Sequence, residues 1–303
     1  MNKHPGTMKI LSPAKINLLL QVTGKRPDGY HNLISLMCCI GLYDTVSLTF
    51  GLETTTVACK HPGVPQDETN LAFKAADLFL KSLNSNEGVG ILIEKKIPVA
   101  AGLGGGSSNA AAVLLGLNRC YGHPFSWEDL VSIGLSIGAD IPFFLFGRPA
   151  IATGVGEKLE AYRGLKKLKI LLINPGFSVS TAEVYKNLNL GLTKCKKKLS
   201  YSLLKKQAFD VRKHLCNDLE TVAAPMYPVI SKAKEALLKY GAIGALMSGS
   251  GPTVFGLFTN SVTARKAKQA LSKDNGWQSY LADMITQDTG YNIDDAGCVI
   301  QDR

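Results

Sequence analysis

The chain has 303 residues with 46% hydrophobic and 19% charged side chains, which excludes a disordered protein and allows a full hydrophobic core. Its formal net charge is +10, so a polyphosphate ligand, a nucleic acid or an anionic membrane would each suit it as a partner. No apolar run is long enough to span a bilayer, and Met1–Met8 leads into no apolar segment of a signal peptide. We therefore expect a cytoplasmic protein with no membrane partner.

The cysteines number seven, are irregularly spaced and include no CxxC pair. Such a pattern predicts neither a zinc site nor a disulfide framework. We expect reduced thiols that are mostly packed in the interior.

Hydrophobic periodicity in the first half of the chain predicts strands and helices separated by turn residues. Asn70 and Ser126 stand at the start of two helical patterns and are expected to be their N-caps. A turn is expected near Gly41, inside the second strand pattern. The strand patterns cover Ile10–Val22, Leu33–Phe50 and Gly90–Glu94, and the helical patterns cover Asn70–Leu83, Ser107–Cys120 and Trp127–Ile137.

The second half of the chain follows a charged stretch at Arg163–Lys169 and again mixes strands with helices. Because the elements do not alternate regularly as in a parallel βαβ protein, the pattern favours an α+β fold with two lobes, residues 1–160 and 161–303. A turn at Ser248–Pro252 separates two of the strands. Strand patterns cover Ile170–Ile173, Ala242–Met247 and Thr253–Phe258, and helical patterns cover Ala182–Asn187, Pro228–Tyr240 and Val262–Ser272.

The segment Pro98–Ser108, PVAAGLGGGSS, carries four glycines directly before a helical pattern. Glycines let the backbone approach an anion closely, and the free N–H groups and positive dipole of a helix start bind phosphate. The alternative is a flexible connector before an ordinary helix that Ser107 or Ser108 caps. The P-loop pattern is absent because no lysine follows the glycines, and GxGxxG fails because Ser107 takes the place of its third glycine. We expect a nucleotide-phosphate loop of a different kind.

Three further segments contain residues that could carry chemistry. Lys15 lies in an apolar strand pattern, where it either faces a cleft or an anion or points to solvent from an edge strand, and Asn17 shares its strand face. Asp140 lies between a helix end and an apolar run, where it either caps a turn or acts as a base at a cleft. Leu246–Val254 holds two glycines between strands, which suits a close backbone approach or a simple hairpin.

These four segments, taken in their order along the chain, resemble the motifs of the GHMP kinase superfamily. That superfamily has an N-terminal lysine motif, a central phosphate loop and a C-terminal glycine motif. The resemblance spans roughly residues 8–285. It implies an ATP-dependent small-molecule kinase of two lobes with the active site in the cleft between them. The motifs RPDGYH at Arg26–His31 and LYD at Leu42–Asp44 are most similar to one branch. That branch phosphorylates the 2-hydroxyl of a methylerythritol bearing a cytidine diphosphate group, in non-mevalonate isoprenoid biosynthesis.

The resemblance also implies roles for individual residues. Asp140 would take the proton from the substrate hydroxyl, and Lys15 would be its cationic partner and stabilise charge on the transferring phosphoryl group. ATP is the implied phosphoryl donor and Mg²⁺ the expected cofactor, although the sequence does not reveal the metal ligands. The implied ATP contacts are Asn70, Lys95, Pro98, Val99, Ala100, Ala101, Gly102, Leu103, Gly104, Gly105, Gly106, Ser107 and Ser108, and the implied substrate contacts are Asn17, Tyr30, His31 and Thr181.

Two alternative functions stay open at this point. One is another kinase of the superfamily, acting on homoserine or mevalonate; the stretch Asp28–His31 argues against it, because a substrate without a nucleobase needs no aromatic and histidine clamp. The other is a nucleic-acid-binding protein, but the chain shows no aromatic-rich basic stripe and no RNP-like motif. A monomer and a homodimer both suit the sequence. The tail Gln287–Arg303 matches no pattern, and the lysine-rich run Lys194–Lys198 is typical of a solvated loop or helix face.

Overall fold

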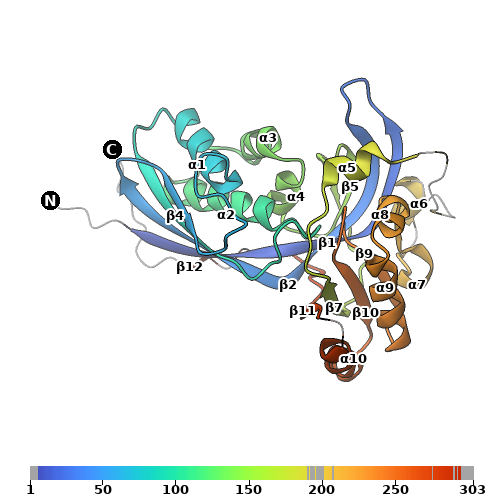
Figure 1. Ribbon diagram of the computed structural model, residues 1–303. Coiled ribbons are helices and arrows are strands. Elements are labelled where there is room, and N and C mark those ends of the chain that lie inside the picture. Colours follow the sequence, from blue (N-terminus) through green and yellow to red (C-terminus); the bar gives the residue numbers. More distant parts are fainter. Residues whose placement is uncertain are drawn as a thin grey trace.

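The computed structural model describes residues 6–189, 191, 195, 201–206, 208–274, 276–288, 291 and 293–294. These residues form an eight-stranded sheet and a four-stranded sheet with helices packed on them (Figure 1). The mixture of mainly antiparallel strands and helices confirms the expected α+β class. The run Lys194–Lys198, apart from Cys195, and most of the tail Gln287–Arg303 lie outside the described residues. No helix in the described part of the chain is long and apolar enough to cross a membrane.

Two long antiparallel strands form the centre of the first sheet. β1 (Thr7–Lys25) pairs with β2 (His31–Leu52), and the middle of both strands is buried. The turn expected near Gly41 is wrong, because β2 runs through this position and the pairing register shifts there, between Pro13 and Ala14 of β1. A β-bulge lets a strand absorb extra residues and bend. The glycine therefore marks a local irregularity within a strand and not a chain reversal.

Four helices cover one face of the first sheet (Figure 1). Asn70 caps the first of them by accepting a hydrogen bond from the Ala72 N–H at 2.9 Å, and Ser126 caps the third in a reciprocal capping box with Asp129. Both caps confirm the sequence prediction. The helices are α1 (Leu71–Ser82), α2 (Gly105–Cys120), α3 (Trp127–Ile137) and α4 (Ile141–Phe146).

The remaining strands of the first sheet come from distant parts of the chain. β4 (Gly88–Glu94) pairs with the second part of β2, and β3 (Thr56–Cys59) pairs with β4. β5 (Ala150–Gly154) pairs with the first part of β2, and β6 (Lys158–Ala161) pairs with β5. Two short strands, β8 (Cys216–Asn217) and β12 (Ile293–Asp294), join β1 from the second half. Periodicity did not predict β5, β6, β8 or β12, since each has two to five residues.

The second sheet has the strand order β11–β7–β10–β9 and is antiparallel throughout. Its strands are β7 (Lys169–Asn174), β9 (Gly244–Met247), β10 (Val254–Phe258) and β11 (Gln278–Asp283). The helices of this half are α5 (Thr181–Lys186), α6 (Tyr201–Lys206), α7 (Val211–His214), α8 (Glu220–Met226), α9 (Val229–Lys239) and α10 (Ser261–Asp274). Every strand and helix expected in the second half is present. The lobe boundary at residue 160 remains a prediction, since β8 and β12 return to the first sheet.

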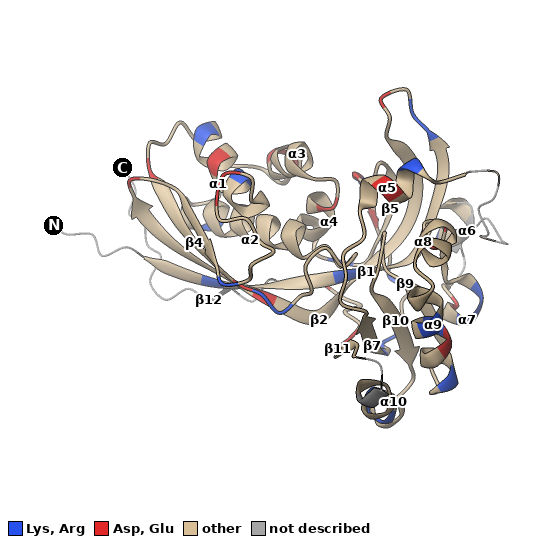
Figure 2. Cartoon of the chain, in the orientation of Figure 1, with Lys and Arg blue, Asp and Glu red and all other residues tan. Residues whose placement is uncertain are grey.

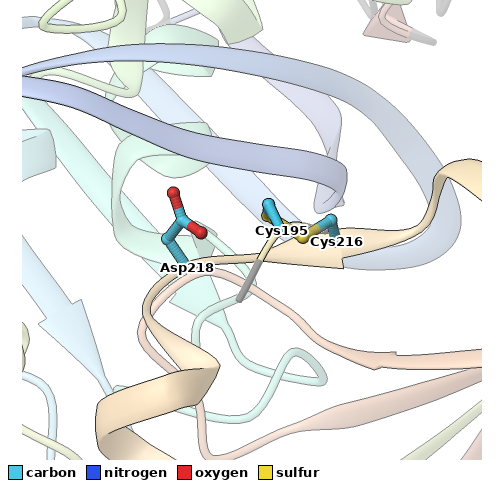
Figure 3. A group of neighbouring side chains, drawn as sticks. All are labelled: Cys195, Cys216 and Asp218. Carbon is cyan, nitrogen blue, oxygen red and sulfur yellow. A yellow bond between two sulfur atoms is a disulfide. The ribbon is translucent and has the colours of Figure 1, made fainter. Parts of the chain in front are cut away.

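The prediction of reduced thiols is wrong for three cysteines of the described chain, Cys120, Cys195 and Cys216. Cys195 and Cys216 form a disulfide, with their Cα atoms 5.7 Å apart, beside the carboxylate of Asp218 (Figure 3). Cys120 is also disulfide-bonded, whereas Cys38, Cys39 and Cys59 are free and buried. Sequence spacing could not reveal the first bridge, because Cys216 is brought into position by the pairing of β8 with β1. The two sulfur atoms are bonded to each other, so the group is a covalent link between segments and not a pair of thiolate metal ligands.

Candidate active site

A cavity of about 630 Å³ lies where the glycine-rich loop meets β1, the start of α4 and the turn between β9 and β10. Both halves of the chain contribute to its wall: Lys15 and Asn17 come from β1, whereas Thr181 and Ser250 come from the second half. Pockets of this size accommodate small-molecule ligands. The cavity is therefore the candidate active site.

The glycine-rich loop is held by close backbone contacts. Gly102 has φ +76° and lies so near the β9–β10 turn that a Cβ atom would approach the carbonyl oxygen of Ser248 to 2.1 Å. The Ser248 hydroxyl in turn donates a hydrogen bond of 2.9 Å to the Gly102 carbonyl. Only glycine allows this backbone conformation together with this approach. The C-terminal glycine motif is a hairpin turn, since β9 and β10 pair across it, and it also supports the glycine-rich loop from behind.

The helix after the loop begins at Gly105, two residues before the expected Ser107. Its N-cap is Gly104, in the left-handed conformation, and no side chain caps the helix. The first N–H groups of an uncapped helix lack partners and add to the positive end of its dipole. Because Gly104–Ser107 line the cavity, this arrangement suits an anion such as a phosphate. The alternative of a serine-capped helix is wrong.

Lys15 and Asp140 form an ion pair at the cavity wall. Lys15 Nζ lies 3.2 Å from Asp140 Oδ2 and donates a hydrogen bond of 2.8 Å to Asn17 Oδ1. Asn17 is held by the Ser35 hydroxyl, which accepts from its Nδ2 at 2.9 Å. The lysine side chain is 5% exposed and that of Asp140 is 40% exposed. The strand lysine therefore faces the cavity and not the solvent.

Asp140 occupies the N-cap position of α4, yet its side chain makes no capping hydrogen bond. The expectation of a turn cap is therefore wrong. Its carboxylate is partly exposed inside the cavity and is free to accept a proton or a hydrogen bond from a ligand there. This is the geometry that a general base requires.

An aromatic stack lies beside the cavity at the end of α5. The rings of His31 and Tyr185 are 5.1 Å apart between centroids, with an interplanar angle of 29°. Burial, with the nearby Asp140 charge, raises the pKa of Tyr185 to about 12, so its hydroxyl stays protonated. Burial and the charge of Lys25 lower the pKa of His31, so the imidazole is neutral at pH 7. Sequence reasoning missed Tyr185, although an aromatic residue four positions after Thr181 on a predicted helix was a usable signal.

Most residues predicted from the sequence meet in this cavity. Tyr30, in contrast, is 63% exposed on the hairpin between β1 and β2, and Leu103 and Ser108 are buried behind the wall. His31 reaches the cavity only through its stack on Tyr185. The predicted residues that line the cavity are Lys15, Asn17, Asn70, Lys95, Pro98, Val99, Ala100, Ala101, Gly102, Gly104, Gly105, Gly106, Ser107, Asp140 and Thr181.

Comparison with known families shows to which family the chain belongs. Residues 70–148 match the GHMP kinases N terminal domain, and residues 200–276 match the GHMP kinases C terminal domain. The chain belongs to the GHMP kinase family. A protein of Syntrophus aciditrophicus is 47% identical over 281 residues, covering 92% of this chain and 99% of the relative, and one of Syntrophotalea carbinolica is 45% identical over 277 residues, covering 91% and 98%. Both relatives carry the name 4-diphosphocytidyl-2-C-methyl-D-erythritol kinase.

Solved structures confirm the two-lobed GHMP kinase fold. A crystal structure of 4-(cytidine 5'-diphospho)-2C-methyl-D-erythritol kinase has a TM-score of 0.73 and 34% identity, covering 91% of this chain and 98% of that chain. Homoserine kinase from Cytophaga hutchinsonii has a TM-score of 0.74 and 19% identity, covering 97% and 99%. At such low identity the second comparison shows the shared fold alone.

Proposed function

We propose that this chain transfers the γ-phosphoryl group of ATP to the 2-hydroxyl of 4-diphosphocytidyl-2-C-methyl-D-erythritol, a step of non-mevalonate isoprenoid biosynthesis. The observation that carries the proposal is the Lys15–Asp140 pair, 3.2 Å apart, in one cavity with an uncapped helix start. Relatives of 44–47% identity that bear the name of this kinase support the choice of substrate.

The arrangement suits phosphoryl transfer, which depends mainly on positioning and charge neutralisation. The substrate oxygen attacks the γ-phosphorus while the bond from that phosphorus to the β–γ bridging oxygen breaks, and ADP leaves. Asp140 accepts the hydroxyl proton, and the Lys15 ammonium stabilises the negative charge that develops on the phosphoryl oxygens. The N–H groups at the start of α2 would bind the phosphates of the nucleotide.

The residues of this cavity fit a Mg²⁺ ion bound together with the nucleotide. This ion prefers oxygen ligands and is usually held by substrate phosphates with one or two protein groups. Among the residues that line the cavity, Ser107 offers a hydroxyl near the start of α2, whereas the carboxylate of Asp140 is kept for the proton of the substrate. When bound, the ion would neutralise phosphate charge during transfer.

The cytidine end of the substrate would lie toward the stack of His31 on Tyr185. An aromatic ring and a neutral imidazole provide stacking and hydrogen bonding to a nucleobase. Tyr30 stands on the adjacent exposed hairpin, where it could cover a bound base from solvent. Thr181, whose hydroxyl lies 2.7 Å from that of Ser250, offers a further substrate contact at the cavity wall.

A second candidate class, nucleic-acid binding, is not favoured. Basic and acidic positions are interspersed on α1 and α9 in the described chain, as Figure 2 shows, whereas a nucleic-acid surface gathers basic residues along one face. The positive net charge instead suits two anionic ligands, ATP and the substrate diphosphate.

The test is an ATP-consumption assay with Mg²⁺ and three alcohols: the cytidyl substrate, homoserine and mevalonate. Turnover only with the cytidyl compound, together with a new phosphomonoester at its 2-position in ³¹P NMR, would support the proposal. Turnover with another alcohol would leave a kinase with a different substrate. No turnover with any of them, from folded protein that still binds ATP, would overturn the proposed reaction.

A further inference from the structure

Asp44, in the LYD segment of β2, lies directly behind the glycine-rich loop. Its side chain is 0% exposed and does not line the cavity. A buried carboxylate is costly unless it is fully paired and hydrogen-bonded. The backbone of Asp44 pairs with β1 opposite Ser12, whereas its carboxylate binds residues of the two segments that flank the glycine-rich loop, so the side chain links the sheet to the loop.

One carboxylate oxygen of Asp44 holds the beginning of the loop. Oδ1 accepts hydrogen bonds from the backbone N–H groups of Lys96 at 2.8 Å and Ile97 at 2.9 Å. These residues follow β4 directly and lead into the loop. The carboxylate thus fixes the point where the chain leaves the sheet.

The other oxygen holds the far end of the loop and a lysine. Oδ2 accepts a hydrogen bond of 3.1 Å from Asn109 Nδ2, in the second turn of α2, and is ion-paired with Lys95 Nζ. Asn109 is also held by the Ser12 hydroxyl, which accepts from Nδ2 at 3.0 Å. Because one carboxylate joins both flanks of the loop, its loss would leave them joined by the longer hydrogen bond of 3.4 Å from Lys95 Nζ to Asn109 Oδ1.

Lys95 stands at an electrostatically unfavourable place. Its Nζ lies 2.9 Å from the position that a Cβ of Gly105 would occupy, beside the first residue of α2, and its side chain is 6% exposed. A cation at the N-terminus of a helix is repelled by the helix dipole, and burial adds a desolvation cost. The negative charge of Asp44, which pairs with Lys95 but does not line the cavity, compensates both effects. The Lys95 ammonium is therefore already held beside the start of α2 in the absence of a bound anion.

We propose that Asp44 is a positioning residue of the nucleotide site: it holds the Lys95 ammonium at the start of α2 and ties both ends of the glycine-rich loop, so that the phosphate-binding groups are preorganised. The inference rests on the proposed function of the cavity as an ATP site. Asp44 itself does not touch the nucleotide and acts through Lys95, Asn109 and the loop.

The substitution Asp44→Asn tests this role, because it keeps an oxygen for the two backbone N–H groups and removes the negative charge. Loss of a charge-assisted hydrogen bond is expected to raise the Kd for a non-hydrolysable ATP analogue about 10- to 100-fold. The KM for the cytidyl substrate should stay within about twofold of the wild type, because its contacts lie elsewhere in the cavity. Calorimetry gives the Kd, and steady-state kinetics give both KM values.

Two further variants separate positioning from a loss of stability. Asn118→Ala removes two hydrogen bonds with Phe125 at the opposite end of α2, so it should lower the melting temperature and leave the Kd for the analogue unchanged. The double variant Asp44→Asn with Lys95→Met removes the unpaired buried cation. It should recover melting temperature relative to Asp44→Asn alone but not recover affinity for the analogue.

The outcomes distinguish the proposed ATP site from the proposed positioning role of Asp44. A wild-type protein that does not bind the analogue overturns the ATP site, and the role of Asp44 with it. Wild-type binding that Asp44→Asn leaves unchanged overturns only the role of Asp44. Equal effects of Asp44→Asn on both KM values, or an equal effect of Asn118→Ala on the Kd, would show a general structural role and overturn positioning as well.

Discussion

Replacing Asp140 with asparagine keeps the size of the side chain and removes its ability to accept a proton. The contribution of a positioned general base is roughly 10²–10⁴-fold, so turnover should fall by that factor while the affinity for ATP changes little. The carboxylate itself is 40% exposed and makes no capping hydrogen bond, so its replacement should not prevent folding. The Lys15 ammonium, however, is 5% exposed and loses its ion-pair partner, which should cost about 1–3 kcal/mol of stability. Lys15 keeps its hydrogen bond to Asn17.

The assay combines kcat for the cytidyl substrate, calorimetric binding of an ATP analogue and thermal unfolding. Asp129→Asn on α3 is the matched control, since it alters an exposed capping box and should change stability by about 1 kcal/mol without changing kcat. Turnover of Asp140→Asn within tenfold of the wild type would refute the role of general base. A variant that fails to fold would show instead that the carboxylate is structural.

Three further outcomes are expected. Tyr185→Ala should raise the KM for the cytidyl substrate far more than that for ATP, because base stacking contributes about 1–3 kcal/mol; equal increases in both would contradict the stack as a base site. Because the pKa of His31 is lowered in the fold, the unfolded chain takes up this proton more readily, and the free energy of unfolding should fall as the pH drops through 6.5. Urea unfolding of His31→Gln should lack this part of the pH dependence, and an unchanged profile would contradict it. Cys216→Ser should lower the free energy of unfolding in non-reducing buffer by about 3 kcal/mol, since the bridge to Cys195 closes a loop with a separation of 21 residues. A variant as stable as the wild type would show that the bridge does not constrain the unfolded chain.

Local sequence patterns were sufficient to predict several helices, their caps, the glycine-rich loop and the family of this protein. Periodicity and capping residues predicted α1 and α3 with their caps at Asn70 and Ser126, because helix starts depend on contacts only two or three residues apart. The four glycines between Gly102 and Gly106, of which two precede α2 and two lie in its first turn, predicted a phosphate loop, since few other functions require so many at a helix start. The order of the four motifs was sufficient to indicate the family, which the comparisons confirm.

Only the tertiary structure decided which polar residues meet. Asp140 has the same sequence context as a turn cap, and its pairing with Lys15 arises from contact between segments 125 positions apart. The bulge in β2, the stack of His31 on Tyr185 and the link of Cys195 to Cys216 likewise depend on register and packing across distant strands and helices. Such contacts leave no periodic signal, because each is one pair formed once the core has brought its elements together.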